Sequence, residues 1–147
     1  MGNDKLHIFG YRTWVLRRLV RELASPEIQR DVWIGGLGEH PSSLVEVVCG
    51  LLDDINAPEM LTAAAEIGIW PPSLLASLGR LLELLKALPE DLVTDDARAI
   101  RHAAWPDVVR VASDVARQLD SFVGRTIEAG PVDDPCDPAS GCGEQTR

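Results

Sequence analysis

The chain has 147 residues, of which 46% are hydrophobic and 25% charged, and its formal net charge is -9. This length and composition suit one folded domain and exclude disorder of the whole chain. A strongly acidic protein repels phosphate backbones, so we expect no nucleic-acid partner. No apolar run approaches the roughly 18 residues of a membrane-spanning helix, so we expect no membrane association.

Charged residues spread between Asp4 and Arg18 interrupt the apolar stretch that a secretory signal requires. The three cysteines are also too few, and odd in number, for a secreted disulfide framework. Both observations favour a cytoplasmic protein. Cys136 and Cys142 are expected as free thiols that can form a disulfide on oxidation, and Cys49 is expected to be buried.

The first clear helical pattern covers residues 12–24, while 6–9 could be a short strand. Ser25 and Pro26 have the residue types of an N-cap and a first helical position, which predicts a second, short helix to about Trp33. The glycine-rich loop that follows, 35–38, lacks the Lys and Ser or Thr of a phosphate-binding loop.

Ser43 and Glu46 have the spacing of a capping box, and an apolar stripe follows them to Ile55. Asn56 and the proline two residues later restart the chain as a shorter helix to about Ile67. These patterns predict two consecutive helices in the middle of the chain.

The strongest periodicity is a set of leucines at steps of three and four, which predicts a long helix that ends before Pro89. Its members are Leu74, Leu75, Leu78, Leu81, Leu82, Leu85 and Leu88. The residues 94–96 then resemble a cap and first turn for a segment reaching Ala104. Pro106 is predicted to open the last long helix, although 108–111 could be a strand if considered in isolation.

These elements predict an all-α fold, a single compact bundle of about six or seven helices over residues 1–128. Residues 129–147 are rich in Pro, Gly and acids and hold one large aliphatic side chain, Val132. Such a segment buries too little apolar area to offset the entropy of ordering, so it is predicted to be a disordered acidic tail.

No group of residues indicates catalytic chemistry. The three histidines, His7, His40 and His102, lack the spacing of a metal site, and adjacent acids on a helix point about 100° apart. We therefore expect no catalytic residue, no cofactor and no metal. An enzyme whose site assembles from distant side chains, such as His40, Glu46 and Asp54, remains one alternative.

Excess acidity is concentrated in residues 35–96, which carry two basic and eleven acidic side chains. Within it, Glu46, Gly50, Asp53 and Asp54 have spacings that place them on one side of a helix. A bare backbone at Gly50 between carboxylates would let a partner approach closely. Alternatively, Gly50 relieves crowding where another helix packs.

We therefore expect a non-enzymatic protein-binding module whose acidic face captures a basic protein partner. Small acidic inhibitor or immunity-type proteins share this general character, which is an analogy of class and not of residues. The alternatives are a structural subunit of a larger helical assembly, or the enzyme described above. Self-association into a homo-oligomer is compatible with each.

Overall fold

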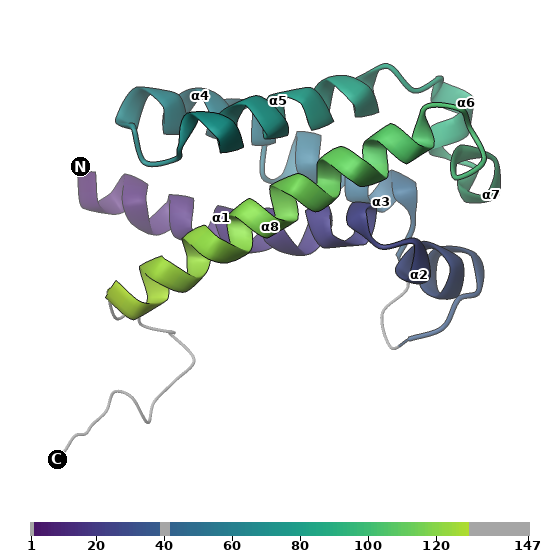
Figure 1. Cartoon of the computed structure of the whole chain (residues 1–147), viewed down its shortest axis with the longest axis horizontal. Helices are drawn as coiled ribbons and strands as arrows, with labels where there is room; N and C mark the ends of the chain where they lie inside the picture. Colours follow the sequence, from purple (N-terminus) through teal and green to yellow (C-terminus); the bar gives the residue numbers. More distant parts are fainter. Residues whose placement is uncertain (1, 39–41, 130–147) are drawn as a thin grey trace, which may run out of the picture.

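The computed structural model describes residues 2–38 and 42–129, and side chains within 10–38 and 42–121. Every regular element among these residues is helical, which confirms the predicted all-α bundle (Figure 1). The elements are α1 (Gly2–Ala24), α2 (Pro26–Ile28), the π-helical turn η1 (Gln29–Ile34), α3 (Leu44–Cys49), the π-helical turn η2 (Gly50–Asp54), α4 (Ala57–Ile67), α5 (Pro72–Lys86), α6 (Glu90–Val93), α7 (Asp96–Ala99) and α8 (Trp105–Ala129). Of the predicted tail, residues 130–147 lie outside the described part, and Ala129 is the last residue of α8.

Side-chain caps begin four of these helices. Ser25, Ser43, Asn56 and Asp95 each accept a hydrogen bond from the backbone amide three residues later, at 3.1, 3.3, 3.3 and 3.2 Å. Each bond satisfies an amide that has no partner inside its own helix. Asp96, the next residue, accepts from the amide of Leu44 at 3.0 Å and so joins α7 to the start of α3. Partial burial raises the pKa of Asp96, and the bond from Leu44 acts against this rise.

Two helix boundaries and one short helix differ from the predicted ones. α1 already begins at Gly2, so the strand considered for residues 6–9 is wrong; no proline interrupts the helix there, and extending a helix is easier than starting one. The segment predicted to reach Ala104 ends at Ala99. There the Nδ1 atom of His102 accepts the amide of Ala104 at 3.1 Å, in place of a helical backbone bond. The four-residue helix α6 was not predicted.

The core lies between α8 and the two helices against which it packs most extensively, α1 and α5 (Figure 1). Six of the seven leucines of the predicted stripe are buried, and the seventh, Leu75, packs against them from a half-buried position. α5 and α8 run antiparallel. Ser73 bonds to Gln118 at 2.8 Å and Ser77 bonds to Asp114 at 2.6 Å, so the residue numbers rise along one helix as they fall along the other.

One buried amide side chain joins the first third of the chain to α8. The Nε2 atom of Gln29 donates to the backbone carbonyls of Glu22 and Leu23 at 3.0 and 2.9 Å. Its Oε1 atom accepts from the indole of Trp105 at 3.0 Å. Trp105 in turn meets the ring of Trp33 edge-on, with centroids 6.0 Å apart. Burial of Gln29 is tolerated because both ends of its amide are bonded.

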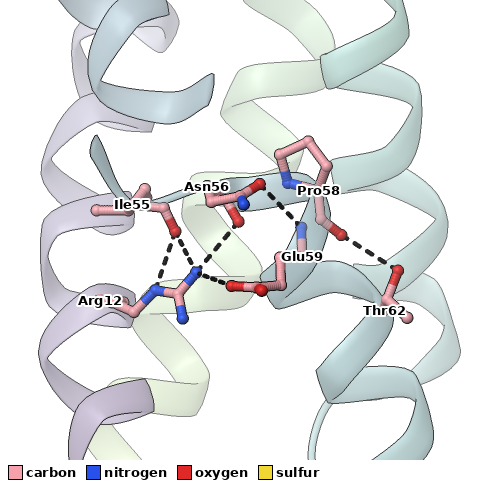
Figure 2. Close-up of polar contacts among 6 residues, drawn as sticks. All are labelled: Arg12, Ile55, Asn56, Pro58, Glu59 and Thr62. Carbon is pink, nitrogen blue, oxygen red and sulfur yellow. Dashed lines mark hydrogen bonds and ion pairs between the residues drawn. The ribbon is translucent and has the colours of Figure 1, made fainter. Parts of the chain in front are cut away.

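Arg12 holds the junction between η2 and α4, as Figure 2 shows. Its Nε atom donates to the carbonyl of Ile55 at 2.9 Å, and its Nη2 atom donates to the same carbonyl and to that of Asn56 at 3.3 Å. Nη2 also pairs with the carboxylate of Glu59 at 3.1 Å. Asn56 adopts a left-handed conformation with φ of 49°, which lets the chain turn between the two helices. The guanidinium thus binds the carbonyl of Ile55 at the end of η2, and it adds a bond to the carbonyl of Asn56, which also accepts the amides of Glu59 and Met60.

Candidate functional site

The four residues predicted to bind a partner come from two consecutive elements, α3 and η2. Glu46 lies on α3, and Gly50, Asp53 and Asp54 lie on η2. The three carboxylates are exposed, whereas Gly50 is buried. A Cβ atom at Gly50 would stand 2.9 Å from the nearest methyl carbon of Leu19. Gly50 therefore lets α1 approach η2 closely, which is the packing alternative considered for it from the sequence.

The winding of this segment is unusual. α3 passes into a π-helical turn at Gly50, so the backbone is wider there than in an α-helix. Such turns occur mostly as short insertions and are frequent at functional sites. Here the wide turn carries Asp53 and Asp54 at its end, next to the junction held by Arg12.

A depression of about 270 Å³ lies between α1 and the α3–η2 segment. We call it the acidic depression. Its lining includes three carboxylates and one guanidinium: Glu22, Glu46, Asp54 and Arg18. Val15, Leu19 and Gly50 supply apolar surface to the same lining. The charged groups therefore sum to two negative charges around a partly apolar hollow.

The lining carboxylates differ in how far they are already engaged. Glu22 accepts from the indole of Trp33 at 2.9 Å and from the hydroxyl of Ser42 at 2.6 Å, so it is held in place. Glu46 and Asp54 make no ion pair with any other described residue. Two acceptors of the depression are therefore open to a cation.

Arg18, the cation of the lining, lies over the ring of Trp14 with its guanidinium carbon 5.5 Å from the centroid. Cation–π contacts of this kind hold an arginine side chain along the helix surface. Trp14 itself is half-exposed, unlike the other three tryptophans, which are buried. An aromatic surface thus adjoins the acidic depression on α1.

Sequence reasoning missed Glu22 and included Asp53. Asp53 is exposed but does not line the depression, so it contributes only to the surrounding field. Glu22 lies 24 residues before Glu46 in the chain, and no local pattern links the two. The available signal was its position three residues after Leu19, at the edge of the apolar stripe of α1.

Cys49 is exposed, so the prediction that it is buried was wrong. Position 49 lies two residues after the buried Val47, about 200° around the helix, and therefore points away from the core. The helical pattern placed this thiol correctly in a helix, but the preference of free cysteine for burial outweighed the periodicity in the prediction.

The remaining candidates form no reactive cluster in the described part of the chain. His102 lies in a turn between α7 and α8. His40, the histidine of the constellation considered with Glu46 and Asp54, lies outside the described residues. Within 2–38 and 42–129, no group of three His, Cys, Asp or Glu residues has the arrangement of a metal site. None of the helices described there is both long and apolar enough to span a bilayer.

No protein-family model, no curated protein and no solved structure matches this chain.

Proposed function

We propose that this chain is a non-enzymatic binding protein that captures a basic segment of a protein partner in its acidic depression. One observation carries the proposal. Glu22 of α1, Glu46 of α3 and Asp54 of η2 line one hollow that also offers apolar surface from Leu19. A Lys or Arg side chain suits this combination, since its methylene stem packs on apolar atoms while its charged head meets carboxylates.

The size of the depression favours a single side chain over a free small molecule. Its volume of about 270 Å³ lies below the range of about 300–1,000 Å³ typical of small-ligand pockets. A protein partner adds contacts around the rim that a small ligand lacks. Trp14, half-exposed beside the depression, offers such a contact because tryptophan is favoured in binding hot spots.

The surrounding field supports rapid association with a basic partner. Asp53 is exposed next to Asp54, and the whole chain has a formal net charge of -9. Exposed charges of this kind act mainly on the rate of encounter, and salt weakens their effect. An inhibitor or immunity-type role in the cytoplasm is part of the proposal, and an exposed free thiol at Cys49 suits a reducing compartment.

The first experiment selects binders from a displayed library of random peptides on the full-length protein. We expect enrichment of peptides with Lys or Arg flanked by apolar residues. The double variant E46Q/D54N should lose this enrichment, because both open acceptors lose their charge. The control E66Q/E90Q removes two exposed charges outside the depression and should retain it. If both variants lost the enrichment of basic peptides, the effect would be one of overall charge and not of the depression. If the wild type enriched no basic peptides, the proposal would be refuted.

A second experiment separates the contacts made inside the acidic depression from the long-range attraction of the surrounding charges. Stopped-flow kinetics with a selected peptide should show that E46Q/D54N mainly raises the dissociation rate, because contacts in the bound state are lost. D53N should mainly slow association, and D53K/D54K should slow it several-fold or more. The association rate of the wild type should fall as the Debye length shrinks from ~10 Å at 0.1 M salt to ~3 Å at 1 M. A flat salt response would contradict electrostatic capture.

A structural-subunit role is the second candidate, and one feature of α1 favours it. Tyr11 and Trp14 lie one helical turn apart, and both are exposed. Two aromatic side chains on one helix face can anchor a neighbouring helix. If Y11A/W14A abolished a stable complex in native extracts while E46Q/D54N left it intact, this second role would replace the first.

A further inference from the structure

A second hollow, of about 640 Å³, lies between α5 and α8, and three arginines line it. Arg80 comes from α5, and Arg110 and Arg117 come from α8. The antiparallel packing fixed by the bond from Ser77 to Asp114 brings the three together, although Arg80 and Arg117 are far apart in sequence. We call this the arginine hollow. It shares no residue with the acidic depression.

Two of these arginines are engaged only weakly. Arg80 approaches Glu83 at 4.0 Å, and Arg110 pairs with Asp107 at 3.2 Å, each within one helix and with both partners largely exposed. Exposed ion pairs of this kind contribute little free energy, because water competes for both groups. Each guanidinium also has five N–H donors, so most of them remain available to a ligand.

Asp114 is the one carboxylate among the lining residues, and its charge is already compensated. It accepts from Ser77 at 2.6 Å and from Gln118 at 3.0 Å, and it pairs with Arg117. The hydrogen bond from Ser77 is the largest influence lowering the pKa of Asp114, with further lowering from Arg117 and Gln118 against partial desolvation. The hollow therefore retains the charge of Arg80 and Arg110 for an incoming anion.

We propose that the arginine hollow binds a small organic phosphate, with its phosphate between Arg80 and Arg110 and its organic part on Ala76 and Val111. Arginine donors match phosphate oxygens in pairs, and a dianion gains more than a carboxylate from two guanidinium groups. The volume lies within the range of small-ligand pockets, unlike that of the acidic depression. A nucleic acid is disfavoured here, because the chain as a whole is strongly acidic.

Isothermal titration of the full-length protein with phenyl phosphate tests the proposal. We expect saturable binding that is tighter than that of inorganic phosphate, which lacks the apolar part, and of benzoate, which lacks the second charge. R80Q and R110Q should each weaken binding by about tenfold, because each removes charge-assisted hydrogen bonds. D114N should strengthen it, because the variant removes the only carboxylate of the lining while an amide oxygen can still accept from Ser77.

R98Q is the matched control. The side chain of Arg98 is 56% exposed, as is that of Arg80, and it pairs with one acid, Asp91, away from the hollow. R98Q should bind phenyl phosphate as the wild type does. Equal weakening by R98Q and R80Q would overturn the proposal in favour of a bulk charge effect. No saturable binding by the wild type up to about 10 mM, or equal affinity for benzoate, would overturn it as well. The melting temperature of each variant verifies that it is folded.

Discussion

Replacing Gly50 by alanine sets two opposing effects against each other at the floor of the acidic depression. The backbone of Gly50 is helical, with φ of -61° and ψ of -44°, so alanine fits its conformation. The change should then gain about 0.8–1 kcal/mol of helix propensity. Against this, the new Cβ atom would stand 2.9 and 3.3 Å from the two methyl carbons of Leu19. Those methyls must move, and an off-rotamer side chain costs about 0.5–1.5 kcal/mol.

The net effect of G50A alone is therefore expected to lie within about 1 kcal/mol of zero. In the background of L19A the obstructing methyls are absent, so G50A should stabilise the fold by its full propensity gain of about 1 kcal/mol. The double-mutant cycle should accordingly give a coupling free energy of about 1 kcal/mol. The measurement is urea unfolding of the four proteins, followed by far-UV circular dichroism.

Gly79 provides an internal control for the propensity gain. It lies inside α5, and a Cβ atom there would meet Leu61 at 3.6 Å, an ordinary contact. G79A should therefore stabilise by about 0.8–1 kcal/mol whether or not Leu19 is present. If G50A had the same effect in both backgrounds, Gly50 would not be packed against Leu19, and the account of the close approach of α1 to η2 would be refuted.

Three further predictions test other parts of the structure. Arg12→Met should lower the free energy of urea unfolding by about 1.5–3 kcal/mol, because it removes charge-assisted bonds to the carbonyl of Ile55. A loss below about 0.5 kcal/mol would contradict the role of Arg12 at the junction shown in Figure 2. Leu78→Ala should lower the free energy of unfolding by about 2–5 kcal/mol, because the side chain is buried. Arg80→Ala should lower it by under about 0.5 kcal/mol. Equal losses would mean that the buried face of α5 is misplaced. Asp114 has a lowered pKa in the fold, so its contribution to stability is present above its unfolded pKa and is lost as pH falls through the lower folded value. The stability advantage of wild type over D114N should therefore shrink on acidification below about pH 4, and a constant difference down to acid unfolding would contradict this assignment.

Local chemistry explains which parts of the fold could be predicted from the sequence. Ser25 and Ser43 begin helices because their hydroxyls bind amides only three residues away, and such a contact is encoded entirely in adjacent residues. The leucine stripe of α5 is equally local, since its period alone identifies the buried face. The close approach of Gly50 to Leu19 of α1 was not predictable, because it joins two helices that are distant in the sequence.

The candidate sites were harder to predict because each combines distant residues. The sequence placed Glu46 and Asp54 on one side of a helix, and both line the acidic depression, but Glu22 joins them only through packing of α1. The arginine hollow was missed entirely. Counting charge along the chain averages Arg80 with its acidic neighbours in residues 35–96, whereas the fold places it across from Arg110.

The pairing of α1 with α8 has a consequence for folding during synthesis on the ribosome. Arg17 of α1 bonds at 2.6 Å to Asp120 of α8, which lies 103 positions later in the sequence. At a synthesis rate of about 5–20 residues per second, roughly 5–20 s pass between the synthesis of Arg17 and that of Asp120. During this interval the apolar side chains of Leu16, Val20 and Leu23, all fully buried in the finished fold, have no α8 to cover them. The nascent chain should therefore present α1 to chaperones as a transient binding segment, and should lose that affinity once α8 has emerged.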